Sequence, residues 1–296
     1  MTPAWPRPST APSATSIWPS KNSIPDGWWW DSAQQKRNKA LNKLHPPTVS
    51  LSKFISIFME LITGKNILIT GATGGIGQES AKLLKQSGGK IFITGRDTEK
   101  LARVKEELQL PDNQVFTLDI ADEAAVIRVA AAIHAQVTQL DILVNAAGIG
   151  IIKPMESLTA EEFRRTLDSN LTGPFLLMKH FLPPMKEARK GLIINIPGVL
   201  GKTPMAGAAA YTASKYGLNG MMKSIREELK RTDIRITNLF LGGVDTHFWD
   251  TIDLRVQREK FIVAKEAARA IWFLCQQPSS GVVSEMVIQP FNHQAI

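Results

Sequence analysis

A short apolar run followed by closely spaced glycines most constrains how this chain folds. Residues 67–69 (Ile-Leu-Ile) form the run, and Gly71, Gly75 and Gly77 follow it. Such a run is typical of a strand buried on both faces, and residues 78–85 continue with helical periodicity. Glycines between a strand and a helix let the backbone turn tightly and leave room for a phosphate at the helix N-terminus. An ordinary glycine-rich turn has a similar composition, so the rest of the chain decides.

Strand and helix patterns alternate from Asn66 onward, which predicts an α/β fold with a parallel sheet covered on both faces. After the first strand, further strands are expected at 90–94, 114–118, 141–145, 191–196, 234–240 and 285–288. Helices are expected at 97–108, 122–137, 161–186, 208–230 and 265–276. Residues 242–263 have no clear period and predict a loop with short helices over the strand ends, where such folds bind ligands.

The first 58 residues differ in composition from the rest of the chain. They hold eight of the 17 prolines and five of the seven tryptophans, and no apolar periodicity connects them. This composition predicts a disordered extension, residues 1–58, before a single domain at 59–296. Three interpretations stay open: a targeting segment, a partner-binding arm that uses tryptophan and lysine, or a stretch upstream of a true start at Met59.

The formal charge of +8 is concentrated in this extension. Residues 1–58 carry seven Lys and Arg against two Asp and Glu, whereas residues 59–296 carry 28 against 25. The nearly balanced domain argues against a nucleic-acid partner. Cys275 is the single cysteine, which excludes an internal disulfide and a cysteine-based metal site and suits a reducing compartment. No apolar run reaches the ~18 residues of a membrane-spanning helix, and no histidines have metal-site spacing.

Tyr211 and Lys215 enclose the sequence Thr-Ala-Ser in a segment with a helical pattern. Positions i and i+4 of a helix share a face, so the phenol and the ammonium are expected to point the same way. A neighbouring ammonium favours the phenolate and is expected to lower the pKa of Tyr211 from about 10. Such a tyrosine can donate a proton to a carbonyl or accept one from an alcohol near neutral pH. Taken alone, this spacing is more often a surface tyrosine and an unrelated lysine.

Four motifs occur together and in a fixed order. Besides the glycine turn at 70–77 and the tyrosine–lysine pair, the chain has Asn-Ala-Ala-Gly at 145–148 and Asn170 within Ser-Asn-Leu-Thr-Gly. In this order and spacing the motifs resemble the short-chain dehydrogenase/reductase family, and the chain is similar to its 3-oxoacyl-carrier-protein reductase-like members over residues 59–296. The resemblance implies a single Rossmann-like, doubly wound domain with a mainly parallel seven-stranded sheet.

The resemblance also implies which residues act. Tyr211 would be the general acid/base, Lys215 would lower its pKa and hold the nicotinamide ribose, and Asn170 would orient a water in a proton relay. Asp119 would contact the adenine, and Thr246 would reach the nicotinamide amide. The residues expected to bind the cofactor are Gly71, Thr73, Gly75, Ile76, Gly77, Arg96, Asp119, Asn145, Gly148, Lys215 and Thr246.

The residues that follow the second strand bear on the choice of cofactor. An acidic residue there would hydrogen-bond the adenosine ribose hydroxyls and repel a 2′-phosphate. This chain has Gly95 at that place and Arg96 beside it, and a guanidinium offers a planar fork to phosphate. The pattern favours NADP(H) over NAD(H), although Asp97 is close and Arg96 could instead be a solvated surface charge.

One position departs from the family pattern at the reaction centre. The family places a serine thirteen residues before the tyrosine, where it hydrogen-bonds the substrate carbonyl, and this chain has Gly198 there. Loss of such a donor lowers turnover roughly 10²–10³-fold. Ser214 faces another side of the helix from Tyr211 and is no obvious substitute. Gly198→Ser is therefore expected to raise turnover, provided that no positive φ at this position misplaces the hydroxyl.

The sequence favours one function and leaves a second open. We expect an NADP(H)-dependent oxidoreductase that interconverts a carbonyl and an alcohol on a small or acyl-type substrate, with Tyr211 as acid/base. The alternative is a cofactor-binding, catalytically weak member that acts as a sensor or scaffold, because Gly198 replaces the serine. The expected partner is the small-molecule substrate, without nucleic acid or membrane. A cytoplasmic homodimer or homotetramer that pairs the helices at 161–186 and 208–230 is expected.

Overall fold

A seven-stranded sheet forms the centre of the described part of the chain. The computed structural model describes residues 61–278 and 280–291, so the expectations for residues 1–58 and Met59 lie outside the described residues. The strands are β1 (Asn66–Thr70), β2 (Lys90–Gly95), β3 (Val115–Thr117), β4 (Ile142–Asn145), β5 (Lys190–Asn195), β6 (Asp233–Leu241) and β9 (Glu285–Ile288). Their order is β3-β2-β1-β4-β5-β6-β9, and all neighbours run parallel. The chain winds from β1 to one edge and then to the other, which confirms the Rossmann-like doubly wound α/β fold.

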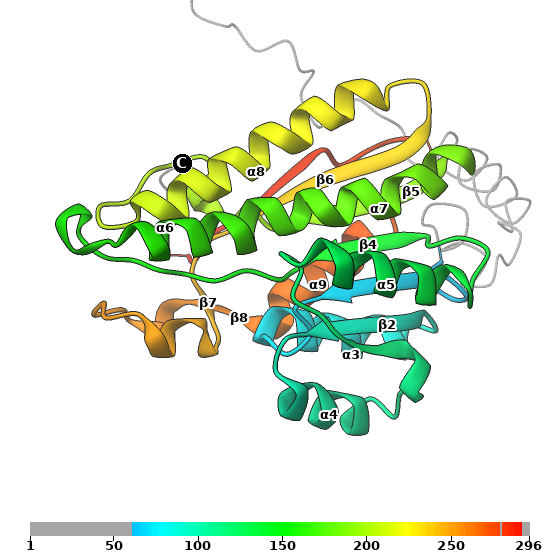
Figure 1. The fold of residues 1–296 in the computed structure, drawn as a ribbon, viewed down its shortest axis with the longest axis horizontal. Helices are drawn as coiled ribbons and strands as arrows, with labels where there is room; N and C mark the ends of the chain where they lie inside the picture. Colours follow the sequence, from blue (N-terminus) through cyan, green and yellow to red (C-terminus); the bar gives the residue numbers. More distant parts are fainter. Residues whose placement is uncertain (1–60, 279, 292–296) are drawn as a thin grey trace, which may run out of the picture. The chain divides into compact units, whose positions relative to one another are not determined.

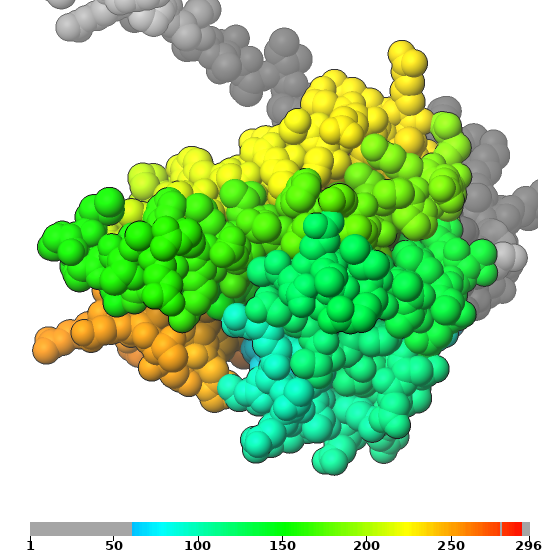
Figure 2. All heavy atoms as spheres, viewed as in Figure 1, coloured from blue at the N-terminus to red at the C-terminus, as the bar shows by residue number. Residues whose placement is uncertain are grey.

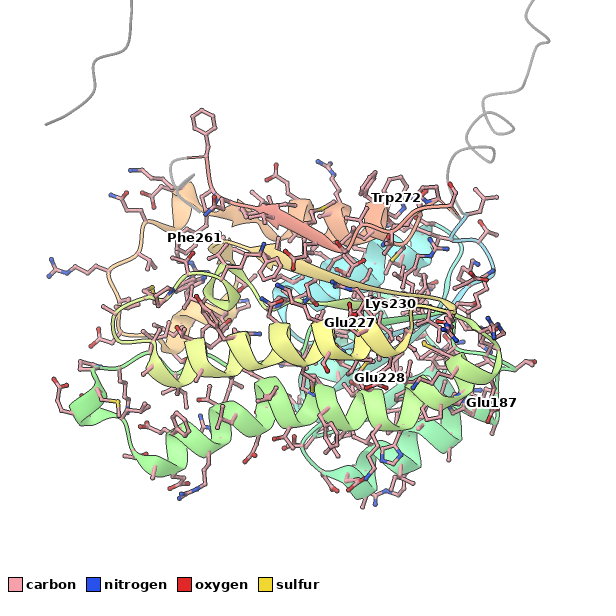
Figure 3. The ribbon with its side chains drawn as sticks, turned by 90° about the horizontal axis from the view of Figure 1, so that it is seen from above. Glu187, Glu227, Glu228, Lys230, Phe261 and Trp272 are labelled. Atoms are coloured by element: carbon pink, nitrogen blue, oxygen red, sulfur yellow. The ribbon has the colours of Figure 1, made fainter. Side chains whose placement is uncertain are left out.

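Helices cover both faces of this sheet. They are α3 (Gly75–Gln86), α4 (Thr98–Glu107), α5 (Glu123–His134), α6 (Ala160–Leu167), α7 (Gly173–Glu187), α8 (Ala209–Glu228) and α9 (Ala264–Leu274). One core lies between the sheet and α5, α7 and α8, and the other lies between the sheet and α3, α4 and α9. Figures 1 and 3 together show α7 and α8 side by side on one face of the sheet, with α9 on the opposite face. Within residues 61–278 and 280–291, none of the helices has the length and apolar character needed to span a membrane.

Side-chain alternation explains why the strands are apolar throughout. Leu68 and Leu143 belong to the core under α5, α7 and α8, whereas their neighbours Ile67 and Val144 belong to the opposite core. Successive strand residues point to opposite faces, so a strand covered on both sides needs apolar residues at every position. The register then places Thr70 beside Asn145, which brings the glycine turn next to the Asn-Ala-Ala-Gly motif.

Two acidic caps fix where the helices of the first half begin. The Asp97 carboxylate accepts a hydrogen bond from the backbone N–H of Lys100 at 3.0 Å, and Asp122 accepts one from Ala125 at 3.1 Å. An N-cap acid satisfies a backbone donor that has no partner within the helix. The helices expected from residues 97 and 122 accordingly begin one residue later, at Thr98 and Glu123.

The single long helix expected over 161–186 is interrupted. A π-helical turn, Asp168–Thr172, separates α6 from α7. Such a turn lets the chain accommodate an extra residue without ending the helix, and it often marks a functional site. Asn170 lies in this turn and is 1% exposed, so the interruption coincides with a predicted site residue.

The segment after β6 is more ordered than the expected loop with short helices. Besides two 3₁₀ turns, His247–Thr251 and Arg258–Lys260, it contains two short strands, β7 (Val244–Asp245) and β8 (Ile262–Val263), that pair in parallel. Strands of two residues are too short to produce a hydrophobic period. Seen from above in Figure 3, Phe261 of this segment and Glu187 at the end of α7 lie on opposite sides of the view.

Candidate active site

A cleft of about 820 Å³ opens beyond the C-terminal ends of the central strands. Its wall includes residues that follow β1, β2, β3, β4, β5 and β6, together with α8 and the segment after β6. In Figure 2 the surface is hollowed between this orange segment, the green helices and the blue-cyan start of the sheet. The chain reverses direction across the sheet between β1 and β4, and ligands bind at such switch points in doubly wound folds.

The glycine turn borders this cleft and packs too closely for side chains. Gly71 has φ of +69°, and a Cβ there would lie 2.6 Å from the Cα of Ala147. A Cβ at Gly77 would lie 2.3 Å from the carbonyl oxygen of Gly71. No side chain caps the N-terminus of α3, so its first backbone N–H groups have no side-chain acceptor. This start of α3 fits the phosphate-binding turn that the sequence predicts.

The far end of the cleft brings two cations together. Arg96 and Lys100 both line it, and a Cβ at Gly95 would lie 2.7 Å from the Cγ2 of Thr73. An acidic residue at position 95 would therefore displace Thr73. The Asp97 carboxylate is occupied as the cap of α4, and the Lys100 N–H holds its pKa below the usual value. Sequence reasoning missed Lys100, although its place four residues after Arg96, at the start of a helix, was a usable signal.

Tyr211 and Lys215 meet in the cleft wall as their spacing predicts. The Lys215 Nζ lies 5.4 Å from the centre of the Tyr211 ring and donates a hydrogen bond to the carbonyl of Ile196 at 3.0 Å. Lys215 is 6% exposed, and α8 carries both residues on the face turned to the cleft. The geometry therefore places an ammonium beside a phenol inside a largely desolvated site.

Burial reverses the expected shift of the tyrosine pKa. Desolvation raises the pKa of Tyr211 above its usual value and lowers the pKa of Lys215 to about 8. The lowering expected from the sequence considered only the neighbouring charge, whereas loss of hydration disfavours both charged forms. At neutral pH Tyr211 is therefore a neutral proton donor, and Lys215 is still mostly charged.

Asn170 lies behind the cleft rather than in its wall. Its Oδ1 accepts a hydrogen bond from the Ile149 N–H at 2.9 Å, and its Nδ2 donates to the Ile149 carbonyl and the Ser214 hydroxyl at 2.9 and 3.0 Å. A Cβ at Gly148 would lie 3.0 Å from the same Oδ1. Ser214 is buried and donates to the Tyr211 carbonyl, so its hydroxyl faces away from the cleft, as expected. The water-orienting role of Asn170 stays a prediction.

Gly198 has a backbone conformation that serine does not share. Its φ is +66° and its ψ is 172°, a region that is essentially restricted to glycine. A Cβ there would lie 3.4 Å from the Leu241 carbonyl oxygen, so space exists but the backbone is unsuitable. The expected gain from Gly198→Ser is corrected accordingly, because the positive φ would strain the new side chain.

The end of the cleft beyond Tyr211 is apolar. Its side chains are Ile149, Ile152, Val199, Leu200, Met205, Phe248 and Trp249. The Phe248 ring lies 5.9 Å from that of Tyr211, and a Cβ at Gly150 would lie 2.2 Å from its Cζ. His247 is exposed and pairs with Asp250 at 2.8 Å. Sequence reasoning did not single out Phe248, because no period marks its segment.

The other residues predicted to bind the cofactor also border the cleft. They are Thr73, Gly75, Ile76, Asp119, Asn145, Gly148 and Thr246. Asp119 accepts a hydrogen bond from the Ala121 N–H at 3.0 Å, and a Cβ at Gly75 would lie 2.6 Å from the Cγ2 of Thr246. Within the described residues, no three His, Cys, Asp or Glu side chains are grouped to hold a metal ion.

Sequence comparison decides the family. The sequence profile of the family described as short chain dehydrogenase matches residues 65–256. This chain belongs to the short-chain dehydrogenase/reductase family. As a member of this family it is an oxidoreductase.

Relatives of this short-chain dehydrogenase/reductase span the same domain. An uncharacterised oxidoreductase of Staphylococcus epidermidis is 29% identical over 232 residues, which cover 78% of this chain and 100% of the relative. An NADP-dependent 3-hydroxy acid dehydrogenase of Salmonella typhi is 28% identical over 236 residues, 76% of this chain and 94% of the relative. A metagenomic short-chain oxidoreductase, whose crystal structure was solved in complex with NADP, is 31% identical in sequence and superposes with a TM-score of 0.67. The match covers 78% of this chain and 99% of that protein's chain. The likeness to 3-oxoacyl-carrier-protein reductases in particular stays a prediction.

Proposed function

We propose that this chain is an NADP(H)-dependent enzyme that interconverts a carbonyl and an alcohol on a small, uncharged apolar substrate. The observation that carries the proposal is the position of Tyr211 and Lys215, at the junction of the glycine-lined and apolar ends of one cleft. A carbonyl at this junction would have the phenol on one side and apolar side chains on the other.

The residues of the chain would divide the work as follows. The bound nicotinamide supplies or accepts a hydride. The neutral Tyr211 hydroxyl donates its proton to the developing alkoxide, and the Lys215 ammonium stabilises the phenolate that remains. The Ile196 carbonyl fixes the Lys215 ammonium. Asn170 holds the backbone of Ile149 in place through two hydrogen bonds and makes a third to the Ser214 hydroxyl.

Arg96 and Lys100, at the far end of the cleft, support NADP(H) as the preferred cofactor. Relatives of the chain are described as NADP-dependent or bound to NADP, and Arg96 offers a planar fork to a 2′-phosphate. Wild-type protein is expected to bind NADPH at least tenfold more tightly than NADH, about 1.4 kcal/mol, and Arg96→Ala to remove most of this difference. Fluorescence titration with both cofactors measures this difference, and Arg103→Ala, in the following helix α4 and outside the cleft wall, is the control. Equal wild-type affinities would contradict the assignment.

The apolar end of the cleft indicates an uncharged substrate. The lysines and arginines that line the cleft within the described residues are Lys215 at the centre and Arg96 and Lys100 at the far end, where the Lys100 ammonium lies 3.5 Å from the Asp97 carboxylate. His247 also lines the cleft and pairs with Asp250. Among the residues that the structure describes, no further lysine or arginine lines the apolar end, where it could bind a substrate carboxylate. The chain is therefore expected to differ in substrate from its relative that acts on 3-hydroxy acids.

A panel of carbonyl compounds tests both the activity and this preference. With NADPH, we expect a neutral 3-oxo ester to show at least a tenfold higher kcat/KM than the matching 3-oxo acid anion, because the anion would be desolvated without a partner. NADPH oxidation, followed at 340 nm, measures the rates. The propyl and benzyl esters of the same 3-oxo acid extend the series of neutral substrates. A preference for the anion would contradict the proposed substrate class.

The sensor or scaffold role stays the second candidate, and Gly198 is the observation that favours it. It predicts tight NADPH binding without turnover of any member of the panel. The homodimer or homotetramer, the cytoplasmic location and the domain division at residue 58 stay predictions.

A further inference from the structure

Four buried asparagines form a row from the cofactor cleft to the loop that carries Gly198. Three of them lie on neighbouring strands: Asn145 ends β4, Asn195 ends β5, and Asn238 lies near the end of β6. Asn195 is paired in register with both Asn145 and Asn238. Asn219 of α8 packs over them. Their side chains are 4%, 0%, 0% and 8% exposed, in the order 145, 195, 238 and 219. Buried amides are costly unless they are hydrogen-bonded, so a row of them in an apolar core calls for a specific reason.

A backbone carbonyl fixes the direction of two amides in the row, Asn219 and Asn238. The Gly201 carbonyl can only accept, so Asn219 donates its Nδ2 to it at 3.1 Å. The Asn219 Oδ1 then accepts from the Asn238 Nδ2 at 3.0 Å, which turns the Asn238 oxygen toward Asn195. At the other end the Asn145 Nδ2 donates to the Asn195 Oδ1 at 2.7 Å. Amide orientations are ambiguous when side chains are considered one at a time, but a chain anchored on a carbonyl has one consistent assignment.

The link between the two halves of the row is complementary. Within the described part of the chain, Asn195 Nδ2 and Asn238 Oδ1 are both buried without a hydrogen-bond partner, and their residues are directly paired across β5 and β6. One is a donor and the other an acceptor, so a small rotation or one bridging water completes the chain without changing its direction. Either closure connects Asn145 to Gly201 through amides that polarise one another.

The cleft end of the row carries a free acceptor. Asn145 lines the cleft, and its Oδ1 is buried and has no hydrogen-bond partner among residues 61–278 and 280–291. At the other end, the Gly201 N–H donates to the Gly198 carbonyl at 3.0 Å, in the loop that would face the substrate. We propose that the four asparagines are a positioning relay, in which Asn195, Asn238 and Asn219 hold the Asn145 side chain, and with it the end of β4 that borders the bound cofactor, in one orientation. This inference rests on the proposed cofactor site.

The relay predicts an effect on cofactor binding from a residue outside the cleft. Asn219→Ala is expected to weaken NADPH binding about tenfold, because Asn238, Asn195 and then Asn145 lose their fixed orientation. Asn145→Leu is expected to weaken binding at least as much, and the double variant no further than Asn145→Leu alone, because both changes act through the side chain at position 145. Fluorescence titration of the full chain with NADPH measures all three without requiring turnover.

A matched buried amide separates positioning from general stability. Gln277 is 2% exposed, donates to the Thr237 hydroxyl at 3.0 Å and accepts from the Val283 N–H at 2.7 Å, away from the cleft. Gln277→Ala is expected to lower the melting temperature as Asn219→Ala does, while leaving NADPH affinity within twofold of wild type. An Asn219→Ala protein that melts lower but binds NADPH like wild type would overturn the relay.

A diffraction structure of the free wild-type protein, at a resolution that distinguishes amide nitrogen from oxygen, gives a second measurement if a variant does not fold. The expected result is the Asn145 oxygen toward the cleft and continuous hydrogen bonding between Asn195 and Asn238, directly or through one water. A nitrogen facing the cleft would overturn the relay. This structure also decides the relay if wild-type protein fails to bind NADPH, a result that would count against the proposed function itself.

Discussion

Tyr211→Phe is expected to lower carbonyl reduction by about 10²–10⁴-fold, the range that a positioned general acid contributes, while NADPH binds as it does to wild type. The phenol is held beside the Lys215 ammonium, and Gly198 provides no side-chain donor that could share its task. Removing one oxygen atom deletes the proton source but leaves the ring packing against Phe248 intact. The measurements are kcat/KM for a neutral ketone and the NADPH dissociation constant.

The second tyrosine of the chain is the control for this substitution. Tyr216 is 42% exposed and donates its hydroxyl to the Lys202 carbonyl, outside the cleft wall. Tyr216→Phe removes the same atom from the same helix and is expected to leave turnover within twofold of wild type. Turnover that survives Tyr211→Phe would show that another group donates the proton, and the proposed mechanism would be wrong.

The strands, the helices and most of the cleft were predictable because each has a local pattern. Ile67–Ile69 alternates between two cores, and Asp122 caps a helix. Glycine is required at 71 and 77 because an added Cβ would lie only 2.6 and 2.3 Å from backbone atoms. These features act within a few residues of sequence. The family resemblance then joined the separate motifs, because strand order brings Thr70 beside Asn145 in a way that no single motif reveals.

The features that sequence reasoning missed depend on contacts between distant segments. The raised pKa of Tyr211 arises from desolvation by the assembled cleft, and the π-helical turn at Asn170 accompanies its hydrogen bonds to Ile149 and Ser214. The short strands β7 and β8 show no hydrophobic periodicity in the sequence. Arg258 stabilises the segment between them by donating hydrogen bonds to the Asp245 and Asp250 carboxylates, both at 2.7 Å. None of these properties belongs to one stretch of the chain.

Gly198→Ser is the substitution for which the structure changes the expectation most. At φ +66° and ψ 172° a serine is expected to cost about 1–3 kcal/mol of stability, and turnover is expected to stay at or below that of wild type. A serine at position 198 would not place its hydroxyl where the family has it. The backbone would rotate to relieve the strain of the positive φ, and the side chain would move with it. Denaturant unfolding and kcat/KM on a neutral ketone measure the two effects.

Two alanine variants separate backbone strain from the added hydroxyl. Gly198→Ala carries the same strain without the hydroxyl and is expected to lose as much stability as the serine variant. Gly220→Ala, in α8 with no atom within 4 Å of the added Cβ, is expected to gain up to about 1 kcal/mol of stability, since alanine favours a helix interior.

A serine variant of unchanged stability with at least tenfold higher turnover would show that position 198 accepts the family's donor. If neither wild type nor the serine variant turns over any carbonyl, while NADPH still binds, the positive φ at Gly198 becomes an argument for the sensor role. The backbone at the reaction centre would then favour a conformation that excludes the missing donor.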